Sequence, residues 1–277
     1  MPRHRVETAD AGRIHATADA AVPPPPVQRE TQVDPAIARS PHIALGIPTD
    51  ADPSDDVLLD KEAYVVSYNP KRRDPNWVAW QLDASYLGHV LRKDNFRTDR
   101  LLPAGYYRVT PGDYLRSGYD RAHLCPSADR SSAPEQNALT FLMTNMHPQL
   151  HELNAGPWEQ LEQYERTLAR RPGAELYIAA GGIFDDHPHT IGNGVAVPLA
   201  SYKVIVVLHT GQSFADVTQG TNVIATVMPN VGGVGQHEWT DFVVSVDDVE
   251  TTTGYDFLNR VAPEVQAVIE ARKATVP

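Results

Sequence analysis

The sequence is poor in several features that define common classes of protein. Its 277 residues include a single cysteine, Cys125, which excludes an internal disulfide framework and a cysteine-ligated zinc site. The longest strongly apolar runs, such as VIVVL at 204–208, are far shorter than the roughly 20 residues of a membrane-spanning helix. Basic residues near the N-terminus are followed by no apolar core, so a secretory signal is not predicted. We expect a protein without a membrane segment; its compartment stays open, with the cytoplasm and export by a non-classical route as the alternatives.

Two motifs of hydrolytic enzymes are also missing. No G-x-S-x-G elbow occurs, which argues against an α/β-hydrolase. HPQLH at 147–151 places two histidines four residues apart, but Pro148 and the lack of an H-E-x-x-H motif argue against a zinc helix. DDHPH at 185–189 is interpreted as a polar loop after a strand.

Positive charge is scarce overall and concentrated in one segment. The formal net charge is −11, which argues mildly against nucleic acid as a partner. Residues 71–130, however, hold eleven Lys and Arg against seven Asp and no Glu, a net charge of +4, so the remainder of the chain carries −15. Phosphate contacts are local, and this basic segment therefore indicates a surface for nucleic acid.

Proline divides the chain. Residues 1–57 contain nine of the 23 prolines, including PPPP at 23–26, and show little apolar periodicity. They are predicted to be an extended N-terminal tail or linker, able to pack on the surface of a globular domain over residues 58–277.

Hydrophobic periodicity predicts a mixed domain. Six segments rich in β-branched and aromatic residues are expected to form strands: 63–68, 76–82, 141–145, 175–182, 202–210 and 222–229. Apolar residues three and four apart predict a helix over 158–171, with Asn154 as its N-cap and Pro157 in its first turn. Two short helices are expected at 246–254 and 262–273. Strands on both sides of a central helix indicate an α+β fold with a mainly antiparallel sheet.

Three ionisable residues stand together inside the basic segment, in the sequence Asp120-Arg121-Ala122-His123. A buried strand accepts such charges only when each is paired, whereas a reaction centre for a phosphate ester needs both a base and a cation. Further elements follow in order: N-M-H-P-Q at 145–149, L-N at 153–154 and W-E-Q-L-E at 158–162. Upstream, LRKDNFRTD supplies an R-x-x-x-F-x-x-D element that begins at Arg92.

Together these elements closely resemble the DNA/RNA non-specific endonucleases, a family that includes secreted bacterial nucleases and mitochondrial endonuclease G. The resemblance covers about residues 60–270. It implies a ββα-metal finger nuclease core with a mainly antiparallel central sheet flanked by helices. It also implies an endonuclease that hydrolyses phosphodiester bonds of DNA and RNA, single- or double-stranded, with little sequence preference. Products with 5′-phosphate and 3′-hydroxyl ends are expected.

The resemblance assigns roles to five residues. His123 is expected to take the proton of the attacking water, since histidine titrates near neutrality. Arg121 and Arg92 would contact the phosphate. Asn154 would be the direct ligand of Mg²⁺, for which Mn²⁺ can substitute, because this hard ion keeps most of its waters. Glu162 follows eight residues later on nearly the same helix face, and it would hold the metal through water.

Neighbouring residues have supporting interpretations. Asn145, included among the candidate catalytic residues, is expected to brace the site, as is Gln149. Asp120 is expected to orient Arg121 or the local backbone, and Cys125 to be a small packed residue. Ala122 stands where the family usually has glycine. It would strain the backbone by roughly 1 kcal/mol or more only if this position has positive φ.

Partners and alternatives complete the expectation. The resemblance allows a homodimer and a protein inhibitor. Ala122 and the acidic total charge motivate an alternative hypothesis, a catalytically weakened nucleic-acid-binding protein of the same fold. A third hypothesis is an interaction protein that acts through its proline-rich tail and does not bind nucleic acid.

Overall fold

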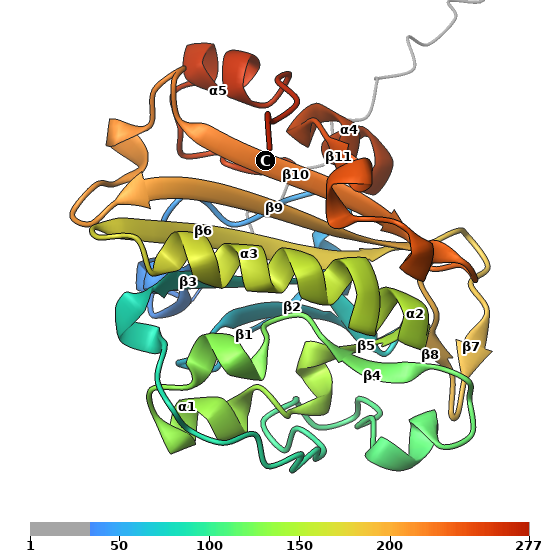
Figure 1. Cartoon of the computed structure of the whole chain (residues 1–277). Helices are drawn as coiled ribbons and strands as arrows, with labels where there is room; N and C mark the ends of the chain where they lie inside the picture. The colour runs from blue at the N-terminus through green and yellow to red at the C-terminus, as the bar shows by residue number, and fades with distance from the viewer. Residues whose placement is uncertain (1–33, 277) are drawn as a thin grey trace, which may run out of the picture. The chain divides into compact units, whose positions relative to one another are not determined.

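The computed structural model describes residues 34–276, and a seven-stranded antiparallel sheet forms its centre (Figure 1). The strand order is β1-β2-β3-β6-β9-β10-β11. The strands are β1 (Val57–Asp60), β2 (Val65–Asn69), β3 (Asp74–Asp83), β6 (Ala174–Ile183), β9 (Ala200–His209), β10 (Asn222–Pro229) and β11 (Val243–Val244). The α+β class and the mainly antiparallel sheet are thereby confirmed.

In the described part of the chain, five α-helices and two small sheets accompany this sheet. The helices are α1 (Pro134–Leu139), α2 (His151–Leu153), α3 (Glu159–Ala169), α4 (Val246–Thr253) and α5 (Pro263–Ile269). The small sheets pair β4 (Asp120–His123) with β5 (Met146–Gln149), and β7 (Thr190–Ile191) with β8 (Val195–Ala196). Within residues 34–276 no helix is both long and apolar enough to cross a membrane.

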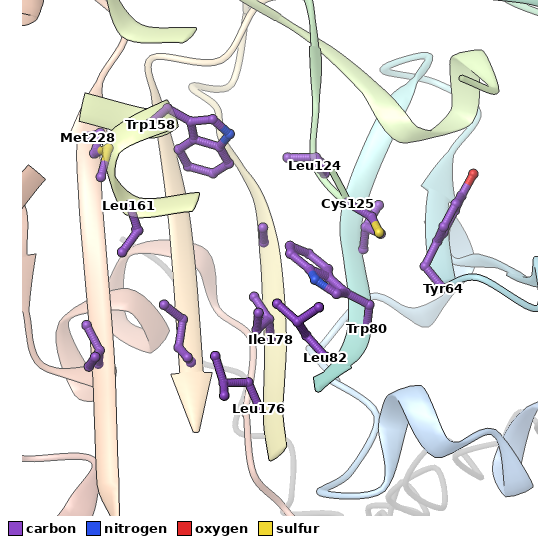
Figure 2. Close-up of a cluster of buried hydrophobic side chains, with 14 of the residues drawn as sticks. Tyr64, Trp80, Leu82, Leu124, Cys125, Trp158, Leu161, Leu176, Ile178 and Met228 are labelled. Atoms are coloured by element: carbon purple, nitrogen blue, oxygen red, sulfur yellow. The ribbon is translucent and has the colours of Figure 1, made fainter. Parts of the chain in front are cut away.

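One face of the central sheet is covered by α3, which lies along β6 and β3 in Figure 1. Figure 2 shows Trp158 and Leu161, at the start of this helix, in the same buried cluster as Leu176 and Ile178 of β6. Leu161 is fully buried. Its spacing of seven residues from Leu168 keeps both on the same face of α3. This face carries the apolar stripe that the sequence predicts for 158–171.

The opposite face of the sheet has its own core. Val246 and Val249 of α4 and Ile269 of α5 pack there with Val204 and Val206 of β9. Because both faces are covered, β3, β6 and β9 are buried along nearly their whole length. The sequences of strands buried on both faces are continuous apolar runs, without alternation of apolar and polar residues, as at 204–208.

Short 3-10 turns before β1 also join this second core. Ile37, Ile43 and Leu45 are buried in it, and the His42 ring accepts a hydrogen bond from the backbone N–H of Gln81. The first 33 residues of the segment 1–57, including the PPPP run, lie outside the described residues.

Two local predictions are wrong. Residues 143–145 form a 3-10 turn, and the strand, β5, begins only at Met146. The reason is Asn145, whose side-chain amide donates to the backbone carbonyls of Cys125 and Thr140 and holds the chain in a turn.

Asn154 is not a helix cap. The helical segment begins at His151 after the N-cap Leu150, and Asn154 has helical backbone angles, φ −60° and ψ −46°. The chain kinks instead at Gly156, just before Pro157, which has no N–H to donate to the preceding turn. Because Asn154 does not cap the helix, its side-chain amide can bind a group outside the helix.

Candidate active site

The two strands β4 and β5 and the helical segment after them place the motif residues around one groove. β4 and β5 pair antiparallel, with Ala122 opposite His147 and His123 opposite Met146. After β5 the chain turns directly into α2 and, past the kink, into α3. This is the ββα arrangement expected from the sequence.

Five of the predicted residues line this groove, which has a volume of about 480 Å³. They are Arg92, Arg121, His123, Asn154 and Glu162. We call this hollow the His123 groove. Residues separated by up to 70 positions in the sequence thus line the same hollow.

His123 is held in an apolar, positively charged setting. Its ring lies edge-on to Phe141, with centroids 4.9 Å apart, and 5.5 Å from Phe96. Burial, with added repulsion from Arg92 and Arg121, lowers the pKa of His123 to about 3. The expectation that this histidine titrates near neutrality is therefore wrong for the free protein. The ring is neutral at pH 7, which is the form that can accept a proton.

Asp120 does not line the His123 groove but binds Asn154, which does. Its Oδ2 accepts hydrogen bonds from Asn154 Nδ2, at 2.9 Å, and from His151 Nδ1, at 2.8 Å. Asp120, which was expected to orient Arg121 or the backbone, orients Asn154 instead. With its nitrogen bound to Asp120, Asn154 keeps its side-chain oxygen as a free acceptor within the part of the chain that the structure describes.

Glu162 belongs to a buried ionic network that the sequence did not reveal. Arg166, one turn further along α3, lies 3.8 Å from the Glu162 carboxylate and donates to Asp129 at 3.0 Å. Asp129 also accepts from the indole N–H of Trp80. Burial raises the pKa of Glu162 to about 8, although Lys203 and Arg166 oppose the shift. The i, i+4 spacing of Glu162 and Arg166 was the signal that could have predicted their contact.

The two predicted phosphate-binding arginines differ in how firmly they are held. The guanidinium of Arg121 lies over the Phe96 ring at 4.3 Å, a cation–π contact that fixes its position. Arg92 is bound through Nε to the Asp94 carboxylate at 2.6 Å, and its side chain is 53% exposed. Arg121 is therefore the more preorganised cation.

Asn145 and Gln149 lie behind the groove. Asn145 is fully buried, and its Oδ1 accepts a hydrogen bond from the backbone N–H of Cys125, two residues after His123. Gln149 donates to the hydroxyl of Ser201 on β9. Both hold β4 and β5 in place, as a bracing role requires.

Ala122 occupies an ordinary strand position. It lies within β4, is fully buried, and is absent from the residues of positive φ between 34 and 276. The replacement of the family's usual glycine therefore introduces no backbone strain.

The oxygen donors in the groove suit a hard divalent cation. Asn154 offers an amide oxygen and Glu162 a carboxyl group, both facing the same hollow. Among residues 34–276, no group of three acidic, histidine or cysteine side chains converges at this groove. An ion bound here would thus keep several waters, as Mg²⁺ prefers, and its charge would favour the ionised form of Glu162.

Comparisons with known proteins agree with this geometry. The family model described as DNA/RNA non-specific endonuclease matches residues 41–264. A nuclease from the cyanobacterium Nostoc sp. is 45% identical over 89% of this chain and 92% of its own length. Human mitochondrial endonuclease G is 30% identical over 74% of this chain and 70% of its own.

A solved structure shares the fold. It is described as a complex of EndoG with EndoGI that explains EndoG inhibition, and it superposes with a TM-score of 0.70 at 28% identity, covering 84% of this chain and 96% of that one. The matched family model, the relatives and the shared ββα site lead to one conclusion. The chain belongs to the DNA/RNA non-specific endonuclease family.

Proposed function

We propose that this non-specific endonuclease of DNA and RNA uses Mg²⁺, with Mn²⁺ as a substitute, and leaves 5′-phosphate and 3′-hydroxyl ends. The observation that carries the proposal is the meeting of a neutral histidine, two arginines, an amide oxygen and a carboxyl group in the His123 groove. These groups supply what hydrolysis of a phosphodiester requires: a base, positive charge and oxygen ligands.

The residues divide the work in the following way. His123 accepts the proton of the attacking water. Arg121 and Arg92 compensate the negative charge that grows on the phosphate oxygens in the transition state. Asn154 would hold the ion directly and Glu162 would hold its waters; when bound, the ion would neutralise charge on the leaving 3′ oxygen.

Binding to backbone groups explains the lack of sequence preference. Arginine contacts to phosphate carry no information about the base. The competing hypothesis of a weakened binding protein is not favoured by the relatives, which are named nucleases. The main reason for that hypothesis, the alanine at position 122, also no longer applies, because Ala122 occupies an ordinary position in β4.

A protein inhibitor is a further proposed partner. It is supported by the solved complex of EndoG with EndoGI, in which a member of the same fold is inhibited by another protein. An active nuclease with little sequence preference needs such control wherever it meets the nucleic acid of its own cell.

A cleavage assay tests the proposal. Purified protein is incubated with plasmid, single-stranded DNA and RNA, each with Mg²⁺, with Mn²⁺ and with EDTA. We expect all three substrates to be cut with either ion and none with EDTA. Fragments that a polymerase extends directly would confirm 3′-hydroxyl ends. Intact substrates in every lane would refute the proposal.

A matched pair of histidine variants controls for contamination. His209→Ala removes an exposed histidine at the end of β9 and should cut as the wild type does. His123→Ala, purified in the same way, should be nearly inactive. Equal activity of the two variants would show that the cleavage comes from another protein or another residue.

A further inference from the structure

The His123 groove continues into a second hollow with a volume of about 610 Å³. We call it the Tyr119 groove; it is lined by Tyr119, Leu115 and Arg116 and shares Arg92, Arg121 and Asn154 with the first groove. The shared residues are the ones proposed to contact the cleaved phosphate and its ion. A strand whose phosphate lies there would extend one flank into each groove.

The two grooves differ in chemistry. Beyond the shared residues, the His123 groove presents mainly small, polar and charged side chains, including Ser127, Asn137, Arg166 and Arg170, and no Phe, Tyr or Trp among its lining residues in the described chain. Such a lining can contact phosphate and sugar but offers no flat apolar surface for a base.

The Tyr119 groove presents apolar surface to solvent. Tyr119 is only partly buried, and Leu115 is 74% exposed. The other aromatic lining residues are not available in the same way, because Tyr114 is buried and Phe96 carries the Arg121 guanidinium on its ring. The half-buried Tyr119 and the exposed Leu115 therefore form the apolar platform of this groove.

Positive charge accompanies that platform. The groove is lined by three arginines and only two carboxylates: Arg92, Arg116 and Arg121, and Asp94 and Asp120. Asp94 is bound by Arg92, and Asp120 accepts from Asn154 and His151. A ring beside cations is the combination that binds single-stranded nucleic acid, in which the base stacks and the phosphate pairs with arginine.

We propose that the Tyr119 groove is a nucleobase subsite, in which the unpaired base on one side of the cleaved phosphodiester stacks on Tyr119 against Leu115. The base on the other side, in the His123 groove, makes no such contact. The inference rests on the proposed cleavage site and adds an asymmetry to it. Because every base has a π face, the subsite is compatible with little sequence preference.

Oligonucleotides with one abasic residue test this asymmetry. Single-stranded hexanucleotides carry a tetrahydrofuran residue at one internal position, and mass spectrometry of the products gives the cleavage rate of each bond. For the wild type, the bond on one side of the abasic residue should be cut about tenfold more slowly than in the intact hexanucleotide. The bond on its other side should change little.

Variants assign the effect to the groove. Leu115→Ser and Tyr119→Ala should cut all bonds of the intact hexanucleotide more slowly and lose most of the asymmetry. Tyr119→Phe, which retains a ring for stacking, should retain the asymmetry. Leu199→Ser is the matched control, since this leucine is 55% exposed but lines neither groove. If Tyr119→Ala does not fold, the wild type and Leu115→Ser still decide the question.

Two outcomes would overturn the proposal. One is equal cleavage on both sides of the abasic residue by the wild type, and the other is an asymmetry that Leu115→Ser and Tyr119→Ala leave unchanged. Both are distinct from failure of the proposed function, in which the intact hexanucleotide itself is not cut.

Discussion

Replacement of Asn145 by alanine separates bracing from catalysis at this site. The side chain makes three buried hydrogen bonds: one from the N–H of Cys125, and one each to the carbonyls of Cys125 and Thr140, at 2.8–2.9 Å. Alanine leaves those backbone groups without these partners in the interior. At about 1 kcal/mol for each, the low end for an unsatisfied buried group, Asn145→Ala should lower the free energy of unfolding by about 3 kcal/mol.

That loss is large but survivable. Domains of this kind unfold with about 5–15 kcal/mol, so the variant should still fold. The midpoint of thermal unfolding should fall by about 10 °C, given about 2–4 °C for each kcal/mol in a domain of this size. Because Cys125 follows His123 by two residues, a relaxed turn would also displace the ring, and we expect kcat to fall by about 10- to 100-fold.

The assay combines urea unfolding with single-turnover cleavage. Asn222→Ala is the control, since Asn222 is exposed on β10 and its replacement should change stability by less than about 0.5 kcal/mol. A variant at Asn145 that unfolds like the wild type but cuts 100-fold more slowly would refute the bracing role. It would indicate that Asn145 contacts the substrate.

Four further predictions concern the groove and the pH dependence of stability. His123→Ala should lower kcat by about 10²- to 10⁴-fold and leave the binding of an uncleavable phosphorothioate strand nearly unchanged in a filter-binding assay. Asn154→Ala should recover part of its activity in a titration with excess Mg²⁺, whereas His123→Ala should not; equal rescue would mean that the roles are misassigned. Arg121→Ala should lower kcat/KM more than Arg92→Ala in steady-state kinetics, because Arg121 is held on Phe96 while Arg92 is half exposed; the reverse order would contradict this reasoning. Burial, with the nearby carboxylates, raises the pKa of Glu270 to about 8, so the folded state keeps a proton that the unfolded state releases above about pH 4.5, and stability measured by urea should therefore fall from pH 5 to 8. Burial raises the pKa of Glu162 to about 8 as well, so Glu270→Gln should remove only part of that fall, and an unchanged slope would contradict the assignment.

Local patterns were sufficient for three long strands and the central helix. The runs at 175–182, 202–210 and 222–229 became β6, β9 and β10 within two residues of their expected ends. The apolar stripe of 158–171 became the buried face of α3. Such elements depend on side-chain periodicity, which is a property of neighbours in the sequence.

The spacing of the motifs was also sufficient to predict the protein family and the residues that line the His123 groove. The elements from Arg92 to Glu162 identified a non-specific endonuclease, and the five residues proposed for its chemistry line one hollow. The seven-stranded order of the sheet did not follow from the sequence, because pairing between distant strands leaves no local mark.

Tertiary structure alone decided how the site residues are bound and charged. Asn154 is a residue type common at helix caps, but Asp120, 34 residues earlier, binds its side-chain nitrogen, so that within the described residues its side-chain oxygen accepts no hydrogen bond. His123 has an ordinary side chain whose pKa falls to about 3, because burial and two arginines disfavour its charged form. Hydrogen-bond partners and desolvation depend on which groups, distant in the sequence, the fold brings within a few ångströms of one another. The amino-acid sequence alone does not give these spatial distances.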